Sequence, residues 1–588
     1  MKRLLSSLVC TLTFILVTKA LAVPLSLSPA AISRSYTGAL TLQISGLTNG
    51  ERVVIERYLD MNGNGTIEAG EPLVDSFSLA DGEVSTIGGV TNLNVPYDRN
   101  PAAGAITTTL SFALPIEAVI GNQIFRLISP YGNFAPQTNI LTVTNANLAQ
   151  TVSGTISAGA SPVPYAMAVA LSMPNNNFVA GVFADASGHY SIKLDPGTYF
   201  IMPALPNYYT DQSLAALVTL TNGGSISADL FLTNGSAAYT ISGQVADATN
   251  GLPLGGVFMQ FESGNLFGVG FTDSNGNYSA PLNSSVWRLK LEGSRLSRRA
   301  YVVSQNKVQV DASAGSVANV NFLLPKANAL FYGRFTDSSS VPFANIDLYG
   351  QDDSGHFKSD GYSDANGNYA VGVLAGPGTG QWNSEPGTGE NPQLQNYLIG
   401  GGLGTTPISP GQAIHQDFTA IHATAQISGH ISDNSGGAVS DVGISGNALI
   451  GGTWYSVFST TDNSGNYVLP ATTGTWSLNV NCCGNQGLDS YGLYDPQMHT
   501  VSIPPNNATL NITVYPTGTP FLSQPVRISP SQFVFGLNGS PGVNYTIQAS
   551  TDLSHWSDLF SLNLTSNWMS VQDNQATNNV KFYRVKKN

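Results

Sequence analysis

The chain has 588 residues, of which only 10% are charged, and its formal charge is −13. Glycine and proline are abundant, at 62 and 32 residues, yet hydrophobic residues still make up 42%. Such a chain is not intrinsically disordered, because disordered chains are poor in apolar residues and rich in net charge. The acidic balance also argues against a nucleic-acid partner, since binding phosphates requires a basic surface.

The first 22 residues have the pattern of an export signal. Lys2 and Arg3 precede an apolar stretch over residues 4–17, and Ala20 and Ala22 supply the small residues that a signal peptidase reads. The apolar stretch is shorter than the ~20 residues that span a bilayer. We therefore expect cleavage after Ala22 and a secreted or cell-surface mature chain without a membrane span.

Residues 60–71 read DMNGNGTIEAGE and match the calcium-binding loop of an EF-hand. Oxygen-bearing residues stand at loop positions one, three, five, seven, nine and twelve, namely Asp60, Asn62, Asn64, Thr66, Glu68 and Glu71. Gly65 is at position six, where the loop must turn sharply. Calcium is a hard cation that takes six to eight oxygen ligands, so the pattern predicts calcium as a cofactor. The alternative is an Asn/Gly-rich turn without a metal.

The segments beside this loop alternate between polar and apolar residues as strands do, and Pro72 directly follows the loop. We therefore expect an Ig-like β-domain over residues 23–147 that carries the loop, in place of the two helices of an EF-hand. Only Asp60 and Glu71 bring a direct charge, which predicts the weak, micromolar to millimolar affinity of an extracellular module.

A repeat of about ninety residues follows, marked by the motif Asp-x-x-Gly-x-Tyr. The four copies begin at Asp185, Asp273, Asp364 and Asp462. About thirty residues before each copy a glycine lies within an alternating run, at Gly154, Gly243, Gly333 and Gly429. A large aromatic residue follows each copy, at Tyr199, Trp287, Trp382 and Trp476. Recurrence of three marks in one order indicates an internal structural repeat.

Each repeat has the pattern of β structure. Apolar residues alternate with small or polar ones, and Gly, Pro, Asn and Asp separate the runs every eight to twelve residues, as in β-sandwiches. In the motif, Asp accepts backbone N–H groups within a turn, Gly supplies a positive φ, and Tyr begins the returning strand with its ring in the core. The sequence therefore predicts an all-β chain of tandem β-sandwich domains.

In these marks the four units resemble the carboxypeptidase regulatory-like domain, a prealbumin-like (transthyretin-like) sandwich grouped with carbohydrate-binding-like folds. The resemblance implies repeats at 148–236, 237–328, 329–424 and 425–520. The family's proline before the second strand corresponds to Pro164, Pro253 and Pro342, whereas the fourth unit has Gly437-Ala438-Val439 there. The fold serves as stalk, appendage and sugar binder alike, so the resemblance implies no single activity.

Two further features lie toward the C-terminus. Cys482 and Cys483 are adjacent, and they form either a vicinal disulfide or a pair of free thiols. Residues 525–588, with Tyr545 and Trp556, resemble a small β-sandwich module found at the C-terminus of large secreted bacterial proteins.

The sequence predicts a non-catalytic protein, because it contains no HExxH, G-x-S-x-G or P-loop motif. Two functions remain: carbohydrate binding or cell-surface adhesion with calcium, and a structural stalk without a ligand of its own. Binding to a polysaccharide or cell-surface partner would use exposed aromatic rings, and for each ring the alternative is packing in a core or a loop. The candidates are Tyr208, Tyr209, Trp454, Tyr455, Tyr491 and Tyr494.

Overall fold

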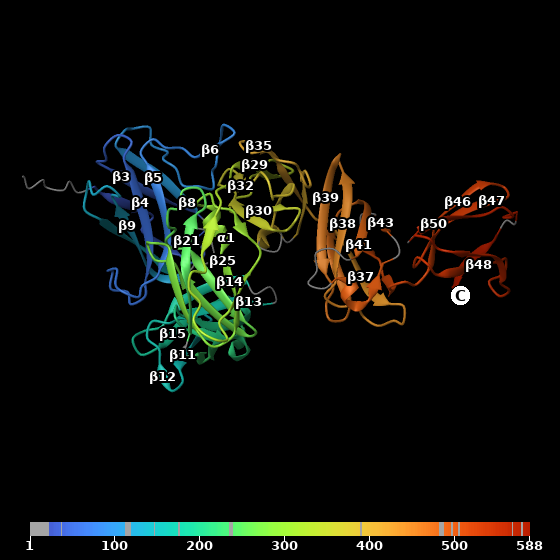
Figure 1. Ribbon diagram of the computed structural model, residues 1–588, viewed down its shortest axis with the longest axis horizontal. Helices are drawn as coiled ribbons and strands as arrows, with labels where there is room; N and C mark the ends of the chain where they lie inside the picture. Colours follow the sequence, from blue (N-terminus) through green and yellow to red (C-terminus); the bar gives the residue numbers. More distant parts are fainter. Residues whose placement is uncertain are drawn as a thin grey trace, which may run out of the picture. The chain divides into compact units, whose positions relative to one another are not determined.

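The computed structural model describes residues 23–588 except 37, 112–118, 146, 174–176, 234–238, 388–390, 395, 481–486, 496–497, 504–505, 567 and 578–579. The chain forms two compact units. One comprises the described residues up to Pro392 together with Gly402–Asp417, and the other comprises Gln393–Gly401 and Phe418–Asn588. Strands dominate both units (Figure 1), which confirms the all-β prediction. No helix in the described ranges is long and apolar enough to cross a membrane.

The first sandwich packs sheet β1–β3–β8 onto sheet β2–β10–β9–β4–β5, with Leu42 and Phe125 fully buried between them. Its strands are β1 (Leu25–Ser28), β2 (Ala31–Ser33), β3 (Ala39–Ser45), β4 (Arg52–Asp60), β5 (Leu73–Ala80), β6 (Thr86–Ile87), β7 (Val90–Thr91), β8 (Ala105–Ser111), β9 (Val119–Ile128) and β10 (Gln137–Thr144). Strand β9 also pairs in parallel with β14 of the first repeat, so one sheet continues from this sandwich into the next.

The first two repeats complete the same architecture, each with its own core. The first contains β11 (Thr151–Ala158), β12 (Ser161–Pro162), β13 (Met167–Ser172), β14 (Asn177–Phe183), β15 (His189–Lys193), β16 (Gly197–Ala204), β17 (Tyr209–Asp211), β18 (Ala216–Leu220), β19 (Ser225–Ser227) and β20 (Leu230–Leu232). The second contains β21 (Tyr239–Asp247), β22 (Phe258–Ser263), β23 (Leu266–Phe271), β24 (Asn277–Leu282), β25 (Val286–Leu291), α1 (Gly293–Ser297), β26 (Val303–Ser304), β27 (Val308–Asp311) and β28 (Phe322–Leu324).

The third repeat and the second unit continue the series. The third repeat contains β29 (Ala329–Asp337), β30 (Asp347–Asp352), β31 (Phe357–Tyr362), β32 (Asn368–Val373), β33 (Trp382–Pro386) and β35 (Ala413–His415). The second unit contains β34 (Tyr397–Gly400), β36 (Phe418–His422), β37 (Ala425–Asp433), β38 (Gly443–Ile450), β39 (Thr453–Thr460), β40 (Asn466–Ala471), β41 (Gly474–Val480), β42 (Leu493–Tyr494), β43 (His499–Ile503), β44 (Ala508–Thr509) and β45 (Ile512–Pro516).

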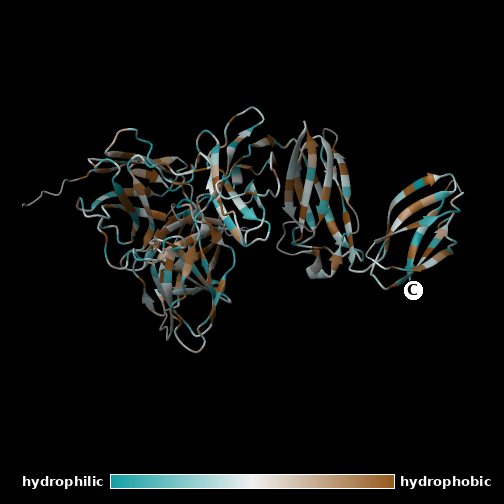
Figure 2. Cartoon of the chain, turned by 45° about the horizontal axis from the view of Figure 1, so that its top comes forward, coloured by the Kyte–Doolittle hydropathy of each residue, from teal (hydrophilic) through white to brown (hydrophobic). Residues whose placement is uncertain are grey.

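The C-terminal sandwich packs sheet β46–β47–β50 onto sheet β49–β48–β51 around the fully buried Tyr545. Its strands are β46 (Phe521–Ser529), β47 (Gln532–Asn538), β48 (Asn544–Ser550), β49 (Ser557–Asn563), β50 (Trp568–Asp573) and β51 (Phe582–Lys587). Hydrophobic and hydrophilic residues alternate along many strands of the chain (Figure 2), as expected where one face of a sheet packs on a core.

The repeated motif forms the same hairpin turn in all four repeats. In the second repeat, the Asp273 carboxylate accepts the backbone N–H groups of Asn275 and Asn277, both at 2.9 Å, and Gly276 has a φ of +71°. The following Tyr278 is buried, as predicted. Aspartate, glycine and tyrosine therefore have the local roles that the spacing predicts.

The tyrosine also makes a long-range contact that explains the glycine of the first strand. The Tyr278 hydroxyl donates to the carbonyl of Val320 at 2.6 Å, and a Cβ on Gly243 would lie 2.0 Å from that same oxygen. Gly243 pairs directly with Tyr278 across β21 and β24. The other three repeats place their tyrosine, glycine and carbonyl in the same way, at Tyr190, Gly154 and Ala228, at Tyr369, Gly333 and Gln416, and at Tyr467, Gly429 and Leu510.

This contact predicts a loss of stability in alkali. Burial raises the pKa of the Tyr467 hydroxyl to about 12, whereas an unfolded tyrosine titrates near pH ~10. Between these values the unfolded chain binds fewer protons, so the stability of the fourth repeat should fall by about 1.4 kcal/mol per pH unit from pH ~10 to ~12. The measurement is denaturant unfolding of the unmodified chain and Tyr467→Phe across this range, followed by a fluorescent reporter within the fourth repeat so that its transition is separated from those of the other domains. Equal slopes in the two proteins would contradict the expectation.

Two details of the repeats differ from the sequence analysis. Pro253 bridges to Ala246, Pro342 to Thr336, and Ala438 to Ser432, but in the first repeat the residue paired at this place is Pro162. In the first repeat, Pro162 therefore occupies the position of Pro253 and Pro342, and Pro164 does not.

The second difference concerns β13. Its small residues Ala168 and Ala170 fill the core of the first repeat, whereas Met167, Val169 and Leu171 face the opposite way. This strand is apolar on both faces.

Helix α1 joins the second repeat to the N-terminal sandwich. The Arg295 guanidinium donates to the carbonyl of Val74 on β5 at 2.5 Å, and Arg298 donates to the carbonyl of Ser111 on β8. The Glu292 carboxylate caps the helix by accepting the N–H groups of Ser294 and Arg295. The arginines of this short helix therefore tie two domains of the first unit together.

Candidate calcium loop and ligand-binding faces

The loop of residues 61–72 joins two antiparallel neighbours, β4 and β5. Asp60 is the last residue of β4 and is buried. Its Oδ1 accepts the N–H of Asn64 at 3.1 Å and its Oδ2 accepts the N–H of Gly65 at 2.8 Å. Gly65 has a φ of +77°, a conformation that favours glycine. The first carboxylate of the loop is thus fixed by the turn that follows it.

The last carboxylate closes the loop on itself. Glu71 Oε1 accepts the N–H of Met61 at 3.1 Å, and Oε2 accepts the N–H of Glu68 at 3.1 Å. Burial raises the pKa of Glu71 above its ordinary value, and the neighbouring negative charges of Asp60 and Glu68 raise it further. The carboxylates of Asp60 and Glu68 therefore lie close enough to Glu71 to repel its negative charge.

Amide oxygens lie between these carboxylates. Asn62 Oδ1 accepts the N–H of Asn64 at 3.0 Å, and Asn64 Oδ1 accepts the N–H of Thr66 at 2.8 Å. The Asn62 oxygen keeps a second lone pair, whereas the Asn64 oxygen also accepts the Thr66 hydroxyl at 2.7 Å. Within the part of the chain that the structure describes, no three His, Cys, Asp or Glu side chains form a metal-binding group. A cation here would depend on the mixed carboxylate and amide set, which fits the oxygen preference of calcium.

We expect calcium to stabilise the N-terminal sandwich. If the dissociation constant is about 0.1 mM, as in extracellular modules, 10 mM calcium adds about 2.7 kcal/mol to the free energy of unfolding. The measurement is hydrogen exchange of β4 and β5 amides in calcium and in chelator. Asp60→Asn and Glu71→Gln should abolish the difference, while Glu83→Gln, which alters an exposed ion pair with Arg52, should retain it. If protection in the unmodified chain does not change with calcium, the loop is a turn that binds no metal.

The structure separates the six candidate aromatic residues. Tyr209 and Tyr455 are buried in the cores of the second and fourth repeats, so neither can offer a ring to a ligand, which corrects the assignment made from the sequence. Tyr208 packs against the core of the first repeat, and Tyr494 contacts Phe521 with ring centroids 6.0 Å apart. Tyr491 is 45% exposed, but its hydroxyl donates to the carbonyl of Ser440.

Trp454 differs from the other five because it is 64% exposed on strand β39. Leu449 pairs with it across β38, and Phe458 follows four residues along the same strand, with exposed fractions of 56% and 49%. Hydroxyl and amide side chains occupy the rest of this face on β38, β39, β41 and β43, at Ser445, Asn447, Ser456, Thr475, Ser477, Asn479, Thr500 and Ser502. At its edge, Ile399 of β34 pairs with Ser456. We call this surface the outer face of the fourth repeat.

Leu449 and Phe458 were not predicted as site residues. Period-two alternation places 454, 456 and 458 on one side of β39, but the sequence alone does not reveal which side faces the core. The vicinal pair Cys482 and Cys483 lies outside the described residues, so its redox state stays a prediction.

No protein-family model matches this chain, and no curated protein shows significant similarity to it. Among solved structures, the chain is similar to the Bacillus anthracis TIE protein, with 11% identity and a TM-score of 0.16 over 68% of this chain and 76% of that one. A streptococcal ancillary pilin matches with 10% identity and a TM-score of 0.16 over 48% and 93%. A DUF3823 family protein from Bacteroides ovatus matches with 11% identity and a TM-score of 0.13 over 28% and 90%. Similarity at this level carries no argument about function.

Proposed function

We propose that this is a secreted, non-catalytic modular protein that binds a neutral glycan through the outer face of its fourth repeat and holds calcium in its N-terminal sandwich. The exposed Trp454 on strand β39 is the observation that carries the glycan proposal. Large exposed apolar residues grouped on one surface mark interaction sites. An indole ring offers a broad apolar face, which suits the C–H face of a sugar ring.

The polar part of the outer face supports the same ligand class. Its side chains are uncharged, and some are already ordered by each other, as where Ser456 donates to Asn447 at 2.6 Å. Hydroxyl and amide groups both donate and accept hydrogen bonds, as sugar hydroxyls do. Strands hold such groups more precisely than loops. A neutral polysaccharide therefore fits this surface better than an acidic one.

The test is retention of the purified chain on insoluble and immobilised polysaccharides, with calcium and with chelator. Trp454→Ala should weaken binding about tenfold or more, as expected for an aromatic anchor. Val468→Ala is the matched control, because Val468 is also exposed but lies on β40 in the other sheet of the same repeat. Chelator should not reduce retention, since the calcium loop belongs to another domain.

Other outcomes overturn parts of this proposal. Retention that Trp454→Ala leaves unchanged, but chelator abolishes, would move the glycan site to the N-terminal sandwich. No retention on a broad panel would reject glycan binding and favour a structural stalk.

A further inference from the structure

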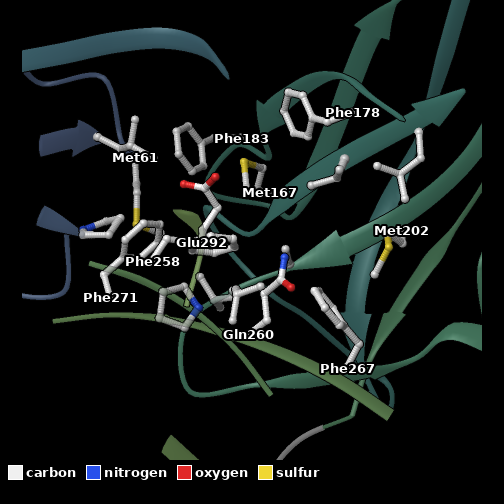
Figure 3. Close-up of a pocket in the computed structure, with 18 of the residues that line it drawn as sticks. Met61, Met167, Phe178, Phe183, Met202, Phe258, Gln260, Phe267, Phe271 and Glu292 are labelled. Carbon is white, nitrogen blue, oxygen red and sulfur yellow. The ribbon is translucent and has the colours of Figure 1, made fainter. Parts of the chain in front are cut away.

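An apolar cavity of about 370 Å³ lies within the first unit, where the N-terminal sandwich and the first two repeats meet. Three of the chain's eight methionines line it, namely Met61, Met167 and Met202. Phenylalanines from β14 and β23 add to the same wall, among them Phe178 and Phe267 (Figure 3). Methionine is flexible and adapts to ligands of different shape.

The apolar wall is a particular property of the first repeat. Ala166 in this repeat and Val442 in the fourth accept equivalent backbone hydrogen bonds, from Ala184 and Thr461. Counting from them along the strand, Val169 and Leu171 correspond to Ser445 and Asn447. The fold of the repeat therefore accepts polar residues at these positions, and the first repeat instead has apolar residues that face a void.

The size of the void suits a small organic molecule. An apolar cavity of about 150 Å³ is large enough to bind benzene, and it stays dry because its walls offer water no hydrogen bonds. The present cavity is more than twice as large and falls in the range of ligand pockets, about 300–1,000 Å³. Most of its lining is apolar, so water gains few hydrogen bonds there and an apolar guest is favoured.

Three polar side chains stand among the apolar ones, namely Gln260, Glu292 and Arg295. The Gln260 amide, on β22, makes no hydrogen bond within the described part of the chain. The Glu292 carboxylate also lines the cavity (Figure 3). Its oxygens accept the N–H groups of Ser294 and Arg295. The Glu292 carboxylate and the Arg295 guanidinium carry opposite charges, so the lining has no net charge to attract an ionic guest, whereas the Gln260 amide can donate to or accept from a neutral one.

We propose that this cavity binds an uncharged apolar molecule with a single hydrogen-bonding group, such as a medium-chain alcohol or an aromatic ketone. The apolar body lies against the Met and Phe side chains, and the polar group pairs with Gln260. This site is independent of the glycan surface, which belongs to the other unit.

The experiment is a fluorescence titration of the full chain with Prodan, an uncharged naphthalene ketone whose emission shifts to the blue in apolar surroundings. We expect saturable binding of one probe per chain and displacement by decanol. Val169→Phe fills the cavity and should weaken binding at least tenfold. The matched control is Val286→Phe, because Val286 is exposed on β25 and does not line the cavity.

Further variants keep the test decisive. Ala204→Leu fills the same space from β16 and should also weaken binding, so the outcome does not depend on the folding of one variant. Thermal unfolding identifies any variant that fails to fold. Gln260→Leu should weaken Prodan binding about fivefold while the blue shift remains. Absence of saturable binding, or equal binding by Val169→Phe and Val286→Phe, would overturn the proposal.

Discussion

Replacing Gly243 with alanine is expected to destabilise the second repeat by about 3 kcal/mol or more, because the new methyl group cannot be accommodated. Its Cβ would lie 2.0 Å from the carbonyl oxygen of Val320. That carbonyl accepts a hydrogen bond from the Tyr278 hydroxyl at 2.6 Å, so moving it away would also break a partly buried hydrogen bond. Steric overlap and the lost hydrogen bond therefore act together.

Hydrogen exchange resolved by repeat measures this effect, since a single unfolding midpoint is poorly defined in a multidomain chain. Gly315→Ala in the same repeat is the matched control, because nothing lies within 4 Å of its Cβ position. It should leave exchange unchanged or slow it slightly, by restricting the unfolded chain. Equal effects of the two substitutions would show that the close approach to Val320 is not needed for stability.

Replacement by alanine should have very different effects on stability at two tryptophans of the fourth repeat. Trp476 is fully buried, and its Nε1 donates to the carbonyl of Thr472 at 2.9 Å. Trp476→Ala should destabilise the repeat by about 3–5 kcal/mol through loss of buried area and the cavity left behind. Trp454→Ala removes an exposed ring and should change stability by no more than about 0.5 kcal/mol.

The pair separates folding from binding when stability and glycan retention are measured on the same samples. In Trp454→Ala, the amide hydrogens should exchange as in the unmodified chain while retention on the glycan is lost. In Trp476→Ala, protection of the amides from exchange should be lost across β38, β39 and β41. If Trp454→Ala also loses protection, its effect on retention says nothing about a glycan surface.

The turns of the repeats were predictable because their chemistry is local. Asp273, Gly276 and Tyr278 lie within six residues, and each has a conformational reason to stand where it does. The acceptor of the tyrosine hydroxyl was not predictable, since Val320 is 42 residues away and any residue can supply a carbonyl.

Strand orientation was the main limit for the candidate sites. Trp454 and Tyr455 are neighbours in one strand, so one faces solvent and the other the core, and composition does not decide which. In β13 apolar residues alternate with small ones, a pattern that by itself favours the larger side chains for the core face, but Ala168 and Ala170 fill the core instead. The cavity beside Met167 depends on the contact of three domains, which no single segment encodes.

The order of strands in each repeat has a mechanical consequence. The first strand pairs in parallel with a strand near the end of the repeat, as β21 does with β28 and β37 with β45. Pulling on the two ends of such a repeat slides these neighbours past one another, so their hydrogen bonds share the force and must break together. A tether built from these domains would resist extension until a whole repeat unfolds cooperatively, and the chain would then lengthen in a single step.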